Sequence, residues 1–85
     1  MYIIVHHKIS DPATFWSTAE AAMAEIPGGV QLRQSFPNTD GSQCVCLWSA
    51  DSVDTVKQLI EPKVGHVSSN EYYEVGTEKS IGLPE

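Results

Sequence analysis

Three histidines and two cysteines are the side chains in this chain that could bind a metal ion or transfer a proton. His6 and His7 are neighbours in a segment typical of a strand, so their rings point to opposite faces of a sheet and do not easily bind one ion together. We interpret one as a core histidine with a hydrogen-bond partner and the other as a surface histidine, with metal binding as the alternative. His66 follows Gly65 in a predicted loop, where it is either a solvated side chain or an imidazole ligand for nickel, zinc or copper.

Cys44 and Cys46 lie two residues apart in a strand-like run, so both point to one face of the sheet. Their β-carbons are expected roughly 6–7 Å apart, too far for the ~4 Å that a disulfide needs. We therefore expect reduced thiols in a cytoplasmic protein. When buried they would act as small hydrophobic side chains, and as thiolates they would suit a soft metal, with Cys46 as the candidate ligand. The spacing places only two ligands on one face, and a metal needs three or four.

Four side chains could line a pocket for a small molecule. Tyr2, Trp48 and Cys44 are expected to line a pocket for an aromatic or planar ligand. Arg33 lies on the polar side of its strand, where it is either an anchor for an anionic group or a surface residue. The sequence contains no nucleophile triad, no phosphate-binding glycine loop and no dinucleotide-binding fingerprint.

Length and charge narrow the classes of function. Eighty-five residues form one domain, expected over residues 1–76, with a C-terminal tail at 77–85. Eleven acidic residues against five scattered basic ones argue against nucleic acid and anionic membrane surfaces as partners. No apolar run approaches the ~18 residues of a membrane span, and the first residues do not resemble a signal peptide, so we expect a cytoplasmic protein.

The spacing of apolar and turn residues predicts six elements. Asp11-Pro12 is a good N-cap followed by a proline at the first helical position, and Pro27-Gly28-Gly29 stops that helix. Asp51 or Ser52 caps a second helix, which Pro62 ends or extends by one further turn. The expected strands are residues 2–9, 30–36, 43–49 and 71–75, the expected helices are 12–26 and 53–61, and residues 66–70 form a loop.

This order of elements predicts an α+β, ferredoxin-like βαββαβ fold with a four-stranded antiparallel sheet in the order 4-1-3-2 and two helices on one face. The two central strands are apolar on both sides, for example Ile3 and Val5 against Tyr2 and Ile4. Because two helices cover only one face, the other would expose an apolar patch larger than soluble monomers usually show. We therefore predict a homodimer in which two such sheets pack face to face.

Two segments resemble a known family. Cys46-Leu47-Trp48-Ser49-Ala50-Asp51-Ser52-Val53-Asp54-Thr55-Val56 resembles the strand-to-helix segment of a bacterial family of small domains of unknown function that includes nickel-binding members. Val64-Gly65-His66-Val67-Ser68-Ser69-Asn70-Glu71-Tyr72-Tyr73-Glu74-Val75 resembles its Gly-His loop and final strand. The resemblance extends more widely to the dimeric α+β barrels and implies a metal near His66. The chain departs from the family pattern at Val67 and at residues 61–63.

These observations leave three classes of function. The first is a homodimer that binds a transition-metal ion (nickel, zinc or copper) through His66, His6, His7 and Cys46, or a small ligand. The alternative is a cofactor-independent monooxygenase or isomerase with its pocket between sheet and helices, in which His6 or His7 acts beside Trp48 and Tyr2. The third is a structural or regulatory module. An enclosed cavity of a few hundred Å3 in the interior of the dimer, with a histidine on its wall, favours the enzyme, and a filled interface favours the structural or regulatory module.

Overall fold

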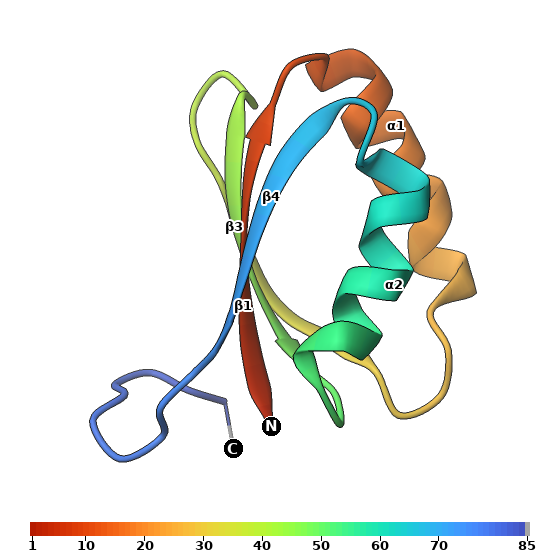
Figure 1. Ribbon diagram of the computed structural model, residues 1–85. Helices are drawn as coiled ribbons and strands as arrows, with labels where there is room; N and C mark the ends of the chain where they lie inside the picture. Colours follow the sequence, from red (N-terminus) through yellow and green to blue (C-terminus); the bar gives the residue numbers. More distant parts are fainter. Residues whose placement is uncertain (85) are drawn as a thin grey trace.

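A computed structural model describes residues 1–84 and confirms the predicted ferredoxin-like fold (Figure 1). The sheet is antiparallel with the order β2-β3-β1-β4, which is the predicted 4-1-3-2 read from the other edge. Both helices lie on the same side of this sheet. The elements are β1 (Tyr2–Ile9), α1 (Pro12–Ala22), a 3-10 turn (Met23–Glu25), β2 (Gln31–Pro37), β3 (Gln43–Ser49), α2 (Val53–Val64) and β4 (Ser68–Glu74).

Both helices begin at the side-chain caps that the sequence indicates. The Asp11 carboxylate accepts a hydrogen bond from the Thr14 backbone N–H at 3.2 Å, which satisfies one of the free donors at the start of α1. Ser52 rather than Asp51 caps α2, since its hydroxyl accepts from the Thr55 N–H at 3.1 Å. Asp51 accepts instead from the Thr55 hydroxyl.

Two predicted boundaries were wrong. The first helix ends at Ala22 and continues only as a 3-10 turn. The second helix passes through Pro62 to Val64, which is the longer of the two ends that the sequence left open. The last strand begins at Ser68 rather than at Glu71, so residues 68–70 form a strand and not a loop. Their polar side chains hid this, because pairing with Ile9, Lys8 and His7 of β1 supplies the backbone hydrogen bonds that the composition alone did not suggest.

The core lies between the sheet and the two helices. Alternate residues of β1 and β3 face the helices, including the fully buried Ile3 and Val5, and pack against Phe15 of α1 and Val56 of α2. No helix within residues 1–84 is long and apolar enough to cross a membrane.

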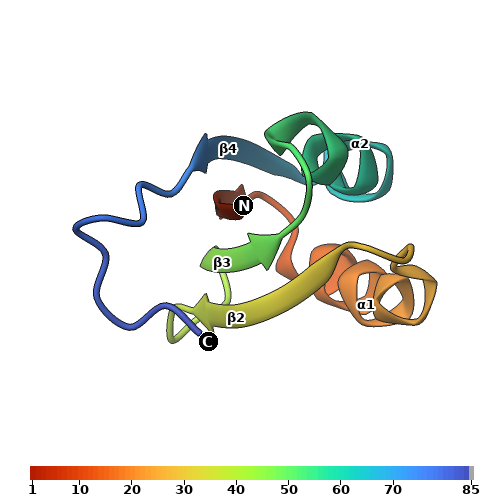
Figure 2. The same ribbon diagram turned by 90° about the horizontal axis from the view of Figure 1, so that it is seen from below.

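The opposite face of the sheet carries the C-terminal tail, which is described as far as Pro84. Figure 2 shows the tail leaving β4 and returning toward β2 on the side away from the helices. The Tyr2 hydroxyl donates to the Pro84 carbonyl at 2.7 Å, and the Gln34 amide donates to the Gly82 carbonyl at 3.4 Å. Two contacts therefore hold the tail against the open face.

Candidate ligand cavity

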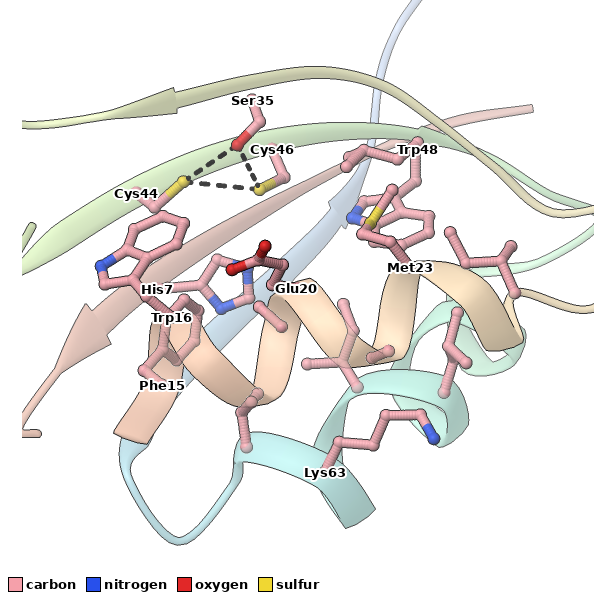
Figure 3. Close-up of a pocket in the computed structure, with 17 residues that line it drawn as sticks. His7, Phe15, Trp16, Glu20, Met23, Ser35, Cys44, Cys46, Trp48 and Lys63 are labelled. Atoms are coloured by element: carbon pink, nitrogen blue, oxygen red, sulfur yellow. Dashed lines mark hydrogen bonds between the residues drawn. The ribbon is translucent and has the colours of Figure 1, made fainter. Parts of the chain in front are cut away.

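A cavity of about 380 Å3 lies between the sheet and the two helices (Figure 3). Its lining is mostly apolar and includes Phe15, Trp16 and Leu59. Polar lining is confined to a few side chains: His7, Ser35, Cys44 and Cys46 on the sheet, and Glu20 and Lys63 on the helices. The volume falls in the range of small-molecule sites, and an apolar wall with few polar groups is typical of them.

A chain of hydrogen bonds holds His7 in the cavity wall. His7 and Asn70 are directly paired on β1 and β4, and Nδ1 of His7 lies 2.6 Å from Oδ1 of Asn70. The Asn70 amide nitrogen donates to Oε2 of Glu61 at 2.8 Å, and the Tyr72 hydroxyl donates to the same carboxylate oxygen. The Ser68 hydroxyl also donates to Oδ1 of Asn70, at 2.9 Å. Because each member has a partner, the imidazole has one fixed orientation.

These partners also fix the tautomer of His7. A carboxylate only accepts hydrogen bonds, so the Asn70 group facing Glu61 is its NH2, and the group facing His7 is its carbonyl oxygen. Nδ1 of His7 must therefore carry the proton, which leaves Nε2 of the neutral ring as an acceptor. Burial lowers the pKa of His7 below its ordinary value, although the Asn70 hydrogen bond acts in the other direction. At neutral pH the cavity therefore presents an uncharged imidazole.

At the far end of the network, the Glu61 carboxyl group is charged and the Tyr72 phenol is neutral. The hydrogen bond from Tyr72 lowers the pKa of Glu61, so this carboxyl group stays ionised. Burial, and then the Glu61 carboxylate, raise the pKa of Tyr72, so the phenol keeps its proton. The Lys57 ammonium lies 5.9 Å from the centre of the Tyr72 ring and adds a cation–π contact.

Cys44, Cys46 and Ser35 form a triangle on the same cavity wall (Figure 3). The two sulfur atoms lie 3.5 Å apart, and the Ser35 oxygen lies 3.4 Å from Cys44 Sγ and 3.6 Å from Cys46 Sγ. Both cysteines are free and buried. The hydrogen bond from Cys46 lowers the pKa of Cys44, and the same bond together with burial raises the pKa of Cys46.

Trp48 lines the cavity and carries a buried, unsatisfied donor. Its side chain is only 7% exposed, and Nε1 is the one buried side-chain nitrogen or oxygen in the described chain without a hydrogen-bond partner. By contrast, Nε1 of Trp16 donates to the Gly41 carbonyl at 3.0 Å. A buried N–H without a partner costs about 1–3 kcal/mol, so native proteins rarely leave one without a reason.

The structure brings together only some of the residues singled out from the sequence. His7, Cys44, Cys46 and Trp48 line the cavity. The other four do not line it: His6, His66, Tyr2 and Arg33. Tyr2, expected beside Trp48, lies on the opposite face of the sheet, because the helix-facing residues of β1 are the odd-numbered ones.

Each of these four side chains has its own surroundings. His6 lies on the open face with Nε2 at 3.1 Å from Oε1 of Gln43, which confirms that the neighbouring histidines point to opposite sides. His66 is exposed after α2. Arg33 sits at an irregularity in the pairing of β2 with β3, and its guanidinium donates to Oε1 of Gln31 at 2.9 Å. Among residues 1–84, no three His, Cys, Asp or Glu side chains are placed to hold one metal ion.

Sequence reasoning missed Asn70, Glu61 and Ser35. Asn70 was placed in a loop, and this hid its pairing with His7 across two strands. A signal was present, since Ser68, Asn70 and Tyr72 alternate as residues on one strand face would. Glu61 lies just before Pro62, where the sequence left open whether the helix ends or continues for one further turn.

Comparison with known proteins adds no assignment: no family model, no curated protein and no solved structure matches this chain.

Proposed function

We propose that the chain binds a small, mostly apolar molecule with one hydrogen-bond acceptor in the cavity between sheet and helices. The unpartnered Nε1 of the buried Trp48 is the observation that carries this proposal. An acceptor on the ligand would satisfy this donor, and the apolar lining would hold the rest of the molecule. A ketone, ester or quinone attached to a small ring system has both features.

The charges around the cavity favour an uncharged ligand. His7 is neutral at physiological pH because burial lowers its pKa, and the other polar groups on the sheet wall are a hydroxyl and two sulfur atoms. Of the two charged lining residues, Glu20 is exposed and Lys63 is half-buried, and their charges have opposite signs. A buried anion would have no dedicated partner here, and burying an unpaired charge is costly.

Fluorescence titration with prodan, a neutral naphthalene dye with one ketone, tests the proposal. We expect a blue-shifted emission on binding. Ala19 lines the cavity, so Ala19→Phe should fill it and abolish the shift, whereas Ala13→Phe on the exposed side of the same helix should not. Trp48→Phe keeps an aromatic ring, although a smaller one, and removes the donor, so it should weaken binding roughly threefold to tenfold. Equal binding by wild type and Ala19→Phe contradicts the proposal.

We also propose that the chain is a homodimer joined through the open face of its sheet. Phe36 and Tyr73 are 62% and 58% exposed on that face, and Val45 is 37% exposed between them. Large apolar side chains grouped on one sheet face are typical of an association surface. A second copy supplies a matching surface by symmetry.

An isomerase is the second candidate function, and the His7 network favours it. Asn70 holds the proton on Nδ1 of His7, so Nε2 is left as a base on the wall of a cavity suited to a ketone. Such a base could remove a proton from the carbon next to a carbonyl group held at Trp48. The transition-metal version of the binding function stays a prediction.

Deuterium exchange tests this second function. Wild-type protein in D2O should accelerate exchange of the methylene protons next to the ketone of bound prodan, as followed by NMR. His7→Gln should bind the dye and lose the acceleration, and Asn70→Asp should alter its pH profile because a carboxylate raises the pKa of the imidazole. Unchanged exchange in His7→Gln would rule out His7 as the base.

A further inference from the structure

The sulfur pair on the cavity wall has a geometry that neither ligand binding nor proton transfer explains. Cys44 and Cys46 point the same way from alternate positions of β3, and their sulfur atoms lie 3.5 Å apart beside the apolar cavity. They are the only two cysteines of the chain. Two thiols at this separation can undergo oxidation to a disulfide or can bind one thiophilic atom between them, and the geometry distinguishes these reactions.

A disulfide would require movement of the backbone. Its sulfur atoms are about 2.05 Å apart and its β-carbons about 3.8 Å apart. In an extended strand, residues i and i+2 are separated by roughly 6–7 Å, and β3 is a central strand paired on both sides. Closing the disulfide would therefore strain a strand that is paired on both sides. Oxidation of the pair is disfavoured.

Binding one atom between the sulfurs requires no such movement. With bonds of about 2.3 Å, the length of metal–thiolate bonds, a span of 3.5 Å between the sulfurs gives an S–atom–S angle of roughly 100°. A linear two-coordinate ion would need about 4.6 Å between the sulfurs at the same bond length. The pair therefore fits a bent centre and not a linear one. A tetrahedral metal would need two further ligands, and no third His, Cys, Asp or Glu joins the pair in the described chain, so a three-bond pyramidal centre fits best.

The side chains and the cavity around the two sulfur atoms determine which group makes the third bond. No third His, Cys, Asp or Glu joins the two cysteines in the described chain, so the protein supplies only two ligands of these types. The space in front of them is the cavity, whose wall is mostly apolar. A centre that already carries one organic group would place that group in the cavity and complete its coordination with the two sulfurs.

We propose that Cys44 and Cys46 form a dithiol site for trivalent arsenicals that carry one small organic group. For phenylarsine oxide the two S–H bonds and the As=O bond are replaced by two As–S bonds, and the oxygen leaves with both thiol protons as water. Arsenic stays trivalent, so neither oxidant nor reductant is needed. The inference rests on the proposed function for the place of the organic group and on the sulfur spacing for the bond to arsenic.

Intact mass spectrometry with phenylarsine oxide tests the site on the full chain. We expect one phenylarsenic group per chain with loss of one water, retained in excess glutathione and removed by a small dithiol. Two linked thiols hold one atom about 100-fold or more tightly than one. Cys44→Ser and Cys46→Ser should therefore each lose retention by at least that factor, while Ser35→Ala, which keeps both sulfurs, should retain the group. Wild-type adduct removed by glutathione overturns the proposal, as does retention in either cysteine variant.

Two further experiments distinguish a failure of this dithiol site from a failure of the proposed function. Arsenous acid forms the same two As–S bonds with loss of two waters and has no organic group, so Ala19→Phe should still retain it while losing prodan and weakening phenylarsine oxide. Retention of both arsenicals without prodan binding would reject the proposed function and support the dithiol. Prodan binding with no glutathione-resistant adduct would reject the dithiol alone. If the serine variants fail to fold by circular dichroism, Cys44→Ala and Cys46→Ala replace them.

Discussion

The two faces of this sheet are built from the same four strands, but their side chains have different surroundings. On the helix-facing side, the buried His7 is paired with the half-buried Asn70, and the apolar residues around them form the core and the cavity wall. On the open side, large apolar residues such as Phe36 and Tyr73 stay exposed and the tail lies across the sheet. His6 and His7 show the contrast in two consecutive residues. Alternation along a strand thus separates a site from a surface.

The largest expected effect is the difference in the free energy of unfolding lost when a side chain is truncated on one face or on the other. Ile3 and Ile4 are adjacent, but Ile3 is fully buried against the helices and Ile4 is half-buried on the open side. Ile3→Ala should lower the free energy of unfolding by about 2–5 kcal/mol, because it leaves a cavity in the core. Ile4→Ala should lower the free energy of unfolding by a smaller amount, as measured in the same urea titration. Equal losses would mean that the open face is as tightly packed as the core.

The next effect tests assembly on the open face. Phe36→Asp and Tyr73→Asp each place a charge on the proposed contact surface while leaving the helix-facing core intact. Each should raise the dimer dissociation constant roughly 30-fold or more, which corresponds to about 2 kcal/mol at an interface hot spot. Sedimentation equilibrium measures this, with Ala13→Asp on the exposed side of α1, away from the open face, as the charge-adding control. A wild-type monomer at high concentration would remove the dimer altogether.

Much of the fold was predictable because local signals agreed with one another. Asp11-Pro12, Ser52 and the Asp40-Gly41 turn mark element ends, and the apolar spacing gives the strand order by the rules of chain connection. The end of α2 and the start of β4 were harder, since Pro62 and the polar residues 68–70 argue locally against the elements they form. Pairing with β1 outweighed those local preferences.

The site was predictable only where it depends on strand alternation. Alternation placed both cysteines on one face and the two neighbouring histidines on opposite faces. It could not say which face the helices would cover, and this decided that Trp48 lines the cavity while Tyr2 contacts the tail. The partners of His7 come from β4 and α2, so they depended on the two boundaries that the sequence obscured.

A pH titration of stability tests the burial of His7. The folded-state pKa of His7 lies below 6.5, so below that pH the unfolded chain binds more protons than the folded one. Stability is therefore fully present above pH 6.5 and is lost as the pH falls toward the folded pKa, by at most about 1.4 kcal/mol per pH unit.

Urea denaturation between pH 7.5 and 5 measures this slope. His7→Gln should flatten it. The carboxyl groups with lowered pKa values, such as Glu61, act in a more acidic range, because they lose their contribution only below their unfolded value of 4.5. A slope that persists in His7→Gln would show that another group titrates in this range.

The smallest effect concerns the tail on the open face. Tyr2→Phe removes the hydrogen bond to the Pro84 carbonyl and should lower the free energy of unfolding by about 1 kcal/mol, while Tyr73→Phe on the same face serves as the control. Deleting residues 77–85 removes this contact together with that of Gln34. The tail and a second copy would share one surface, so each must reduce the space open to the other. Deletion should therefore tighten the dimer in sedimentation equilibrium, and a weaker dimer would instead make the tail part of the interface.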